Sequence, residues 1–128
     1  MINNYRKISS FRDLEAWKRG HSFVLEVYRL AEKFPQKEQF ALTSQICRAA
    51  VSVTSNIAEG FARSSHKEKL HFYAISLGSL AEVQSQLLIA RDIRYITDDE
   101  FNTIELRAEE VGRILGGLVK KTRSHISP

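Results

Sequence analysis

Three polar residues in the middle of the chain, Arg48, Ser52 and Asn56, are spaced four apart and would share one face of a helix. Such a group suits either a ligand-binding or conformational site, or a hydrogen-bonded network that fixes helix register or subunit pairing. No nucleophile or cleft motif accompanies these residues, so the structural role is favoured. A similar polar stripe is expected in the third helix. Together the two stripes form the predicted structural polar network, which comprises Gln45, Arg48, Ser52, Asn56, Glu59, Ser79 and Glu82.

A second candidate for chemistry is a possible metal site. Glu68 and His71 have the Glu-x-x-His spacing of di-metal carboxylate bundles, but such sites need two copies of the motif, and this sequence has one. The single cysteine, Cys47, suits a small packed residue better than a nucleophile. The sequence contains no phosphate-binding loop, dinucleotide fingerprint or convincing catalytic triad. We therefore expect no metal, no cofactor and no enzymatic activity, with a metal-dependent enzyme as the weakest alternative.

The elements that must position these residues are four long helices. Apolar residues at steps of three and four, with few prolines and glycines, predict an all-α, antiparallel, up-down-up-down four-helix bundle. Pro35 should end the first helix, and Thr97 with Glu100 should begin the fourth as a capping box. The bundle is expected as a single domain over 11–123, with helices at about 11–34, 37–62, 66–92 and 98–123 and flexible ends at 1–10 and 124–128.

The spacing also predicts which side chains face the core. The expected core stripes are Leu14, Trp17, Val24, Leu25, Tyr28 and Ala31 in the first helix, and Phe40, Ile46, Ala49, Ala50, Val53 and Ile57 in the second. A second apolar stripe in the second helix lies roughly a hundred degrees from the first and comprises Cys47, Val51 and Ala58. An apolar surface wider than one face indicates deep burial or a subunit contact. These three residues are the predicted oligomer interface.

The composition sets the broad class of protein. The chain has 128 residues, 43% of them hydrophobic and 27% charged, with a formal net charge of +4. This balance is typical of one globular domain, and no apolar run reaches the ~20 residues of a membrane span. The start of the chain lacks the apolar segment of a signal peptide, and one cysteine excludes an internal disulfide. We expect a cytoplasmic protein with no membrane partner.

The positive charge should gather at one end of the bundle. In the predicted topology, the starts of the first and third helices share an end with the ends of the second and fourth. Helix dipoles favour cations at the latter two ends, but they do not favour Lys67 and Lys69 at the start of the third helix. The predicted nucleic-acid-binding residues are Arg12, Lys18, Arg19, Arg63, Lys67, Lys69, Lys120, Lys121 and Arg123, joined at this end by Arg6 and Lys7.

The segment from Gln45 to Gly60, QICRAAVSVTSNIAEG, resembles the signature of the "four helix bundle protein" family, which includes proteins encoded in intervening sequences of large-subunit ribosomal RNA genes. It is also similar to the accessory variability protein of diversity-generating retroelements. Supporting matches are FRDLEAWK at 11–18 and Ser76, Gly78, Ser79, Leu80 and Glu82. The resemblance implies a ring-like homo-oligomer, usually a pentamer. For the retroelement members it also implies binding to nucleic acid and to a reverse transcriptase.

Two functional hypotheses follow from the basic end and the resemblance. The leading one is a non-enzymatic, oligomeric protein that binds the RNA or DNA backbone through its basic end, without strong sequence preference. The alternative is an oligomeric scaffold for a protein partner, such as a reverse transcriptase, that does not bind nucleic acid directly. The second apolar stripe of Cys47, Val51 and Ala58 is the feature that supports the scaffold.

Overall fold

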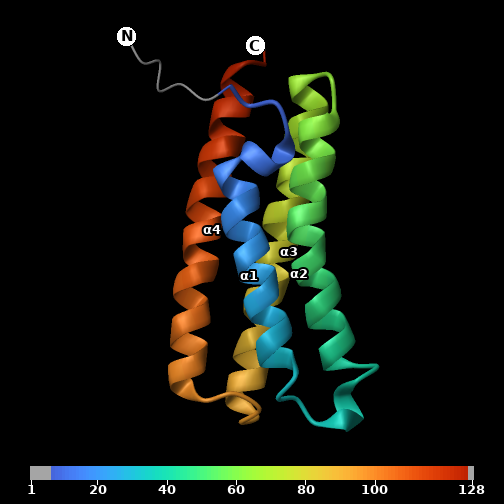
Figure 1. The fold of residues 1–128 in the computed structure, drawn as a ribbon, viewed down its shortest axis with the longest axis vertical. Helices are drawn as coiled ribbons and strands as arrows, with labels where there is room; N and C mark the ends of the chain where they lie inside the picture. The colour runs from blue at the N-terminus through green and yellow to red at the C-terminus, as the bar shows by residue number, and fades with distance from the viewer. Residues whose placement is uncertain (1–6, 127–128) are drawn as a thin grey trace.

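The computed structural model describes residues 7–126 and forms an antiparallel four-helix bundle (Figure 1). In chain order its elements are the 3-10 helix η1 (Phe11–Asp13), α1 (Glu15–Ala31), the 3-10 helix η2 (Gln36–Glu38), α2 (Leu42–Ala62), α3 (His66–Asp92) and α4 (Asp98–Ser124). Each α-helix packs against its two neighbours in the order α1, α2, α3, α4 and back to α1. The predicted fold class is therefore confirmed, and the part of the chain described contains no strand.

The first helix is shorter than the expected 11–34 because both of its ends are interrupted. Ser10 caps a separate 3-10 turn, in which Ser10 and Asp13 form a capping box. Leu14 is then extended, with ψ at 129°, so α1 starts only at Glu15. At the other end, Pro35 disfavours helical geometry at the preceding residue, and α1 ends at Ala31. Residues 7–10 are thus tied to η1 in part, while residues 1–6 and 127–128 lie outside the described structure.

The second helix begins at Leu42, later than the expected 37, because the preceding residues form the η2 turn instead. The sequence offers no Ser, Thr, Asp or Asn at the N-cap, which is Ala41. Glu38 partly replaces the missing cap, because its carboxylate accepts a hydrogen bond from the backbone N–H of Leu42 at 3.4 Å. The same carboxylate also accepts a hydrogen bond from the hydroxyl of Tyr95 at 2.7 Å. Phe40 falls in this turn and is 91% exposed, so its expected place in the core is wrong.

The third and fourth helices span 66–92 and 98–124, close to their expected bounds. Ser65 accepts a hydrogen bond from the backbone N–H of Glu68, and Thr97 with Glu100 forms the complete capping box that was expected. Between the helices, the N–H groups of Arg94 and Tyr95 donate to the carbonyls of Arg91 and Ala90. These two bonds define a Schellman motif, which satisfies the last carbonyls of α3.

The core runs along the bundle axis and contains side chains from all four α-helices. The expected stripe of α2 is buried from Ile46 to Ile57. In α1, by contrast, the core side is formed by Phe23, Val24, Val27 and Ala31, whereas Leu25 and Tyr28 are 43% and 45% exposed. The expectation that Leu25 and Tyr28 face the core is therefore wrong. No helix within residues 7–126 is long and apolar enough to cross a membrane.

Candidate nucleic-acid-binding site

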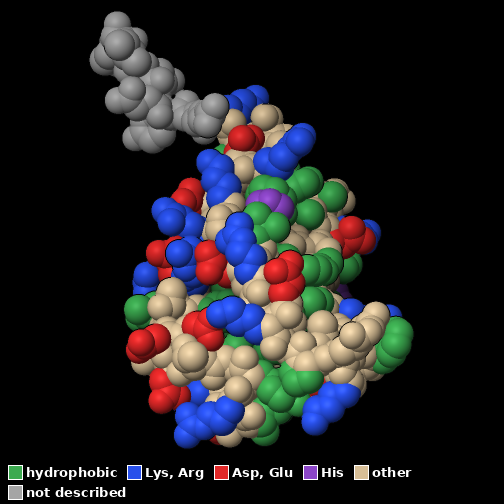
Figure 2. All heavy atoms as spheres, turned by 60° about the horizontal axis from the view of Figure 1, so that its bottom comes forward, with side chains coloured by type: hydrophobic (Ala, Val, Ile, Leu, Met, Phe, Trp, Pro, Cys, Tyr) green, Lys and Arg blue, Asp and Glu red, His purple; other side chains and the backbone are tan. Residues whose placement is uncertain are grey.

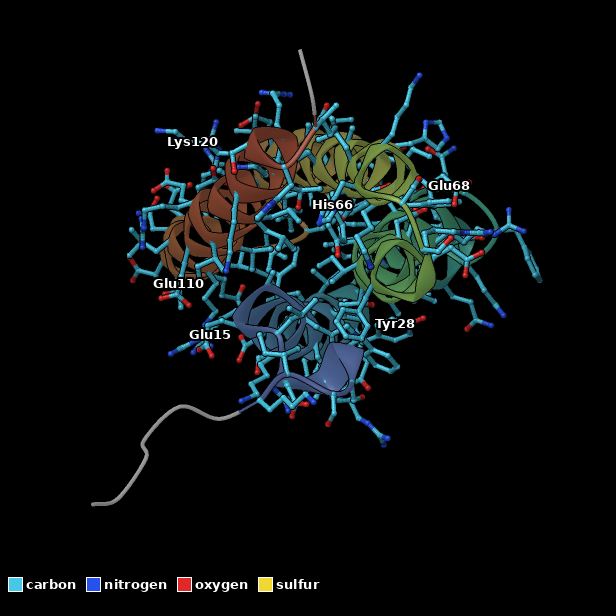
Figure 3. The ribbon with its side chains drawn as sticks, turned by 90° about the horizontal axis from the view of Figure 1, so that it is seen from above. Glu15, Tyr28, His66, Glu68, Glu110 and Lys120 are labelled. Carbon is cyan, nitrogen blue, oxygen red and sulfur yellow. The ribbon has the colours of Figure 1, made fainter. Side chains whose placement is uncertain are left out.

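One end of the bundle brings together the end of α2, the start of α3 and the end of α4, with the chain before α1 beside them (Figure 1). We call this the basic end. The cations there that are exposed and form no ion pair within residues 7–126 are Arg12, Lys18, Lys67, Lys120, Lys121 and Arg123. Figure 3, which looks onto this end, shows Lys120 at the periphery of the bundle. Lys7 is also exposed, whereas Arg6 lies outside the described residues.

The other predicted binding residues are already engaged by the protein. Arg19 pairs with Glu15 at 3.0 Å and Glu110 at 3.5 Å, and the hydrogen bond that it donates to Glu15 raises the pKa of Arg19. Arg63 pairs with Glu59 at 2.7 Å and lies 4.6 Å from the centre of a phenylalanine ring. Such pairing leaves these guanidinium groups less available to a ligand than the unpaired lysines are.

Lys69 explains why a cation can stand at the start of α3. Its ammonium group donates to the carbonyl of Phe61 at 2.6 Å and lies 3.5 Å from the carbonyl of Gly60. Both carbonyls belong to the last turn of α2, where the helix dipole is negative and the carbonyls lack partners within the helix. Lys69 is thus positioned by the end of α2. Its contacts with these carbonyls offset the unfavourable placement of a positive charge at the start of α3.

The opposite end of the bundle has a more balanced charge. Figure 2, which brings this end forward, shows acidic and basic side chains interspersed over the surface. Three ion pairs lie here, joining Lys33 to Glu100, Arg91 to Asp92 at 2.9 Å, and Arg94 to Asp98 at 3.9 Å. Exposed cations without ion pairs are therefore concentrated at the basic end.

The predicted structural polar network falls into two separate groups along the α2–α3 contact. In the first, the hydroxyls of Ser52 and Ser79 are 2.7 Å apart, and the amide of Asn56 donates to the Ser52 carbonyl at 2.8 Å and its hydroxyl at 3.0 Å. This group joins two helices through short side chains. It also satisfies polar atoms that the helix contact partly buries.

The second group is centred on Gln86. Its amide donates to Glu82 at 3.3 Å and to Gln45 at 3.5 Å, and the Gln86 side chain is buried. Arg48 does not join either group: it is exposed, and its side chain has no hydrogen bond or ion pair with any residue that the structure describes. Glu59 is likewise separate, because its partner is Arg63. The geometry of the two groups fits register-setting contacts between α2 and α3.

The predicted oligomer interface lies beside α1. A Cβ atom added at Gly20 of α1 would lie 3.1 Å from Thr54 of α2, which shares a helical face with Cys47, Val51 and Ala58. Val51 is 40% exposed, and burial raises the pKa of the half-buried Cys47 thiol. Figure 3 shows Tyr28 on the same side of the bundle, between α1 and α2. We refer to Leu25, Tyr28, Cys47, Val51 and Ala58 as the α1–α2 apolar surface.

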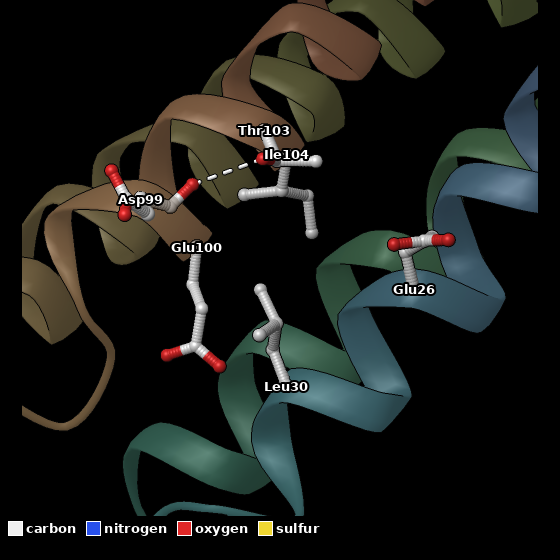
Figure 4. Close-up of a pocket in the computed structure, with 6 residues that line it drawn as sticks. All are labelled: Glu26, Leu30, Asp99, Glu100, Thr103 and Ile104. Carbon is white, nitrogen blue, oxygen red and sulfur yellow. Dashed lines mark hydrogen bonds between the residues drawn. The ribbon is translucent and has the colours of Figure 1, made fainter.

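A hollow of about 250 Å³ lies between α1 and α4, and Figure 4 shows the carboxylate side chains in its lining. Glu26 is 3.3 Å from Arg29 and 3.7 Å from Arg107, and Glu100 pairs with Lys33. Thr103, the one hydroxyl in its lining, donates to the carbonyl of Asp99 at 3.0 Å. Among residues 7–126, no three His, Cys, Asp or Glu side chains are grouped so that they could hold a metal ion. The carboxylates of Glu26 and Glu100 thus act as ion-pair partners, and Glu100 also caps α4.

Comparison with known proteins places the chain in a family. The profile of the family described as 23S rRNA-intervening sequence protein matches residues 12–117. The chain belongs to this family. A crystal structure of a protein of unknown function from the S23 ribosomal protein family of Bacteroides thetaiotaomicron has the same fold, with a TM-score of 0.76 and 21% identity. The match covers 82% of this chain and 98% of that one. No curated protein matches the chain.

Family membership confirms the resemblance drawn from the second helix, but the family description names no reaction or ligand. Two features of this family member were not anticipated from its sequence. Ser76 is completely buried and donates to the Val53 carbonyl at 2.6 Å. A second hollow lies at the basic end, where residues far apart in the sequence meet. Its residues follow helical spacing within α3 and within α4, but only the fold brings these two faces together with Leu14 and Phe61.

Proposed function

We propose that the protein is a non-enzymatic, oligomeric binding protein that associates with the phosphate backbone of RNA or DNA through its basic end. The observation that carries the proposal is the set of exposed cations without ion pairs at that end, including Lys67, Lys120 and Arg123. Lysine and arginine side chains of this kind can neutralise phosphates and release the counterions condensed on nucleic acid. Assembly into a ring would repeat the basic end and strengthen binding through multivalency.

The test is fluorescence anisotropy with a labelled single-stranded RNA and a labelled DNA duplex over a series of KCl concentrations. We expect affinity to fall as salt rises, with a slope of about −0.7 to −0.9 per phosphate contact. Lys67→Gln, Lys120→Gln and Arg123→Gln combined should reduce the slope and weaken binding to every sequence alike. If the unmodified protein binds neither nucleic acid at low salt, nucleic-acid binding is rejected.

A matched control removes the same amount of charge from the other end. Arg29, Lys37 and Arg94 are exposed and lie toward the opposite end of the bundle. Neutralising these three should leave both the affinity and the salt slope close to those of the unmodified protein. An equal loss in the two triple variants would mean that net charge, and not the basic end, governs binding.

The α1–α2 apolar surface supports a second candidate function, an oligomeric scaffold for a protein partner such as a reverse transcriptase. Leu25, Tyr28 and Val51 each expose 40% or more of their surface, although such side chains usually gain free energy from burial. In this case the surface would serve subunit and partner contacts, and nucleic acid would not bind directly. The anisotropy measurement separates the two functions, because a scaffold alone predicts no signal with either nucleic acid.

A further inference from the structure

The hollow at the basic end has a volume of about 250 Å³ and is formed by four parts of the chain. Its apolar lining includes Leu14 from the segment before α1, Phe61 from the end of α2, Tyr73 from α3 and Leu118 from α4. Leu14 and Tyr73 belong to the buried core, and Phe61 and Leu118 pack against it. The bottom of the hollow is therefore the end of the hydrophobic core, left open to the surface.

The polar lining of this hollow is basic. Lys69, Lys121, His66 and His125 all line it, and none of its lining residues within 7–126 carries a carboxylate. The side chain of Lys121 forms no hydrogen bond or ion pair within residues 7–126, and Lys69 uses its ammonium group on two α2 carbonyls, which leaves it one further N–H donor. Cations that face a partly enclosed space without a nearby acid favour an anion there.

The two histidines tie the start of α3 to the end of α4. The rings of His66 and His125 stack with their centres 4.8 Å apart and an angle of 25° between their planes. Figure 3 shows His66 directed toward the middle of this end of the bundle, whereas Glu68 and Lys120 lie toward its outside. The imidazole pair thus adds further hydrogen-bonding groups to the hollow, and the nearest acid of α3 is held away from it.

Tyr73 is the observation that most directly points to a ligand. The residue is only 2% exposed, yet its hydroxyl has no hydrogen-bond partner in the part of the chain described. Its ring packs against Gly60, with ring carbons 2.7 and 2.9 Å from where a Cβ would stand. The hydroxyl is not one of the fully enclosed polar atoms without a partner, and Tyr73 lines the hollow, so this O–H group is accessible to a ligand there. Burial of the residue raises the pKa of Tyr73, which therefore stays a neutral O–H donor. A bound oxygen atom would satisfy it.

We propose that this hollow binds a small organic anion, a single phosphate or carboxylate carried on an aromatic or aliphatic body. The body packs on Leu14, Phe61 and Leu118, while the anionic group accepts hydrogen bonds from Lys121 and Lys69. Small-molecule sites combine an apolar lining with a few convergent polar groups in this way, and the volume suits a ligand smaller than a typical drug. The proposal does not depend on nucleic-acid binding, because the ligand is a free small molecule.

Isothermal titration calorimetry with four probes tests the chemistry of the site. Phenyl phosphate and benzoate carry both an anionic group and an apolar body, whereas inorganic phosphate and benzyl alcohol each lack one of the two. We expect phenyl phosphate to bind saturably with one site per chain and to raise the melting temperature. Inorganic phosphate and benzyl alcohol should bind at least about tenfold more weakly. Absence of saturable binding at millimolar phenyl phosphate, or equal binding of inorganic phosphate, overturns the proposal.

Two variants and one control locate the binding. Tyr73→Phe removes only the unpartnered hydroxyl, so the melting temperature without ligand should stay unchanged or rise, while the affinity for phenyl phosphate falls about twofold to tenfold. Lys121→Gln should weaken binding about tenfold, because a charge-assisted hydrogen bond is lost. Lys120→Gln is the matched control, since this neighbouring lysine is exposed and does not line the hollow. Unchanged affinity in both Tyr73→Phe and Lys121→Gln, or an equal loss in Lys120→Gln, overturns the site.

The outcome for this site can be separated from the outcome for the proposed function. The triple variant that neutralises Lys67, Lys120 and Arg123 leaves the residues lining the hollow intact, so it should weaken nucleic-acid binding and retain phenyl phosphate binding. Saturable binding of phenyl phosphate by a protein that binds neither RNA nor DNA would support the ligand site and reject the proposed function. Binding of RNA without any binding of phenyl phosphate would support the proposed function and reject the ligand site.

Discussion

At the residue scale, the glycines within the helices differ sharply in what surrounds them. A Cβ at Gly60 would lie 2.7 Å from a ring carbon of Tyr73 and 3.1 Å from the Cβ of Phe72. A Cβ at Gly78 would meet nothing within 4 Å. Gly60 is therefore required by the close approach of α2 and α3, whereas no contact among residues 7–126 requires Gly78.

Alanine substitutions should separate these two positions. Gly60→Ala should lower the free energy of unfolding by about 1–3 kcal/mol, because the added methyl group overpacks the contact with the Tyr73 ring. Gly78→Ala should raise it by about 0.5–1 kcal/mol, because alanine favours a helix and nothing obstructs its side chain. Urea denaturation followed by circular dichroism measures both. Equal effects of the two substitutions would contradict the steric explanation.

Arg94 occupies an unusual backbone conformation for its residue type. Its φ of 70° lies in the left-handed region, and it holds the position of the Schellman motif that glycine usually occupies. Arg94→Gly should raise the free energy of unfolding by about 0.5–1 kcal/mol, since glycine adopts this conformation without steric cost. The ion pair lost with Asp98 is long and exposed and should matter little. Arg94→Ala is the control: it loses the same ion pair but keeps a Cβ, so thermal unfolding should show no gain.

At the element scale, the contact between α2 and α3 is set by small polar side chains. The Ser52 and Ser79 hydroxyls meet across it, and the buried Ser76 donates to the backbone carbonyl of Val53. Serines occupy little volume, so they allow the helices to approach closely, and their hydrogen bonds depend on register. Sliding one helix by a turn would separate both pairs and leave the buried Ser76 hydroxyl without its acceptor.

A double-mutant cycle tests the contribution of the hydroxyl pair. Ser52→Ala and Ser79→Ala should each destabilise the bundle, and the double variant should lose less than the sum of the two. The difference, the coupling energy, should be about 0.5–1.5 kcal/mol, the usual range for one hydrogen bond. The exposed Ser85 of α3 provides a matched control, because Ser52→Ala combined with Ser85→Ala should be additive. Equal coupling in both cycles would show that the hydroxyl contact adds nothing specific.

The bounds of the helices could be predicted from the sequence more fully than which face of each helix is buried. Local signals placed α3 and α4, because the caps Ser65 and Thr97 are encoded beside the helices they begin. The faces of α1 could not be chosen from spacing, since two apolar stripes overlap: one contains Phe23 and Val27, the other Leu25 and Tyr28. Only the positions of the neighbouring helices decide which stripe is buried.

The candidate site shows the same division between local and long-range information. The cations of the basic end could be foreseen from charge and topology. That Lys69 is held by carbonyls of α2 could not, because this contact depends on how α2 and α3 meet. The pair of Arg63 with Glu59, by contrast, is a local contact between residues four apart, which the spacing could have suggested. The hollow at the basic end is also invisible in the sequence, since Leu14, Tyr73 and Lys121 share no spacing.

At the scale of the whole molecule, the basic end and the α1–α2 apolar surface lie on different parts of the bundle. Unpaired cations gather at the basic end, whereas the α1–α2 apolar surface runs along the side of the bundle. Self-association through the side of the bundle would leave the ends free for a ligand. The proposed oligomer and the proposed ligand binding can therefore be disrupted by different substitutions.

The molar mass in solution tests this separation. Val51 is 40% exposed in the single chain, so Val51→Glu should leave the fold intact, but it would bury a charge if this surface forms the subunit contact. Multi-angle light scattering at micromolar concentration should then give a lower mass for Val51→Glu than for the unmodified protein. Lys120→Glu should keep the oligomer, because this residue belongs to the basic end. A strict monomer before any substitution would reject the oligomer outright.

A second control decides whether the effect comes from the apolar surface or from any charge added to the bundle. Ser85 is exposed on α3, which does not contact α1, and it is not part of the α1–α2 apolar surface. Ser85→Glu adds the same charge, and circular dichroism should show unchanged helix content in all three variants. If the apolar surface forms the subunit contact, only Val51→Glu should lower the mass, because only there must a carboxylate lose its water on association. Equal masses for Val51→Glu and Ser85→Glu would place the contact elsewhere on the bundle.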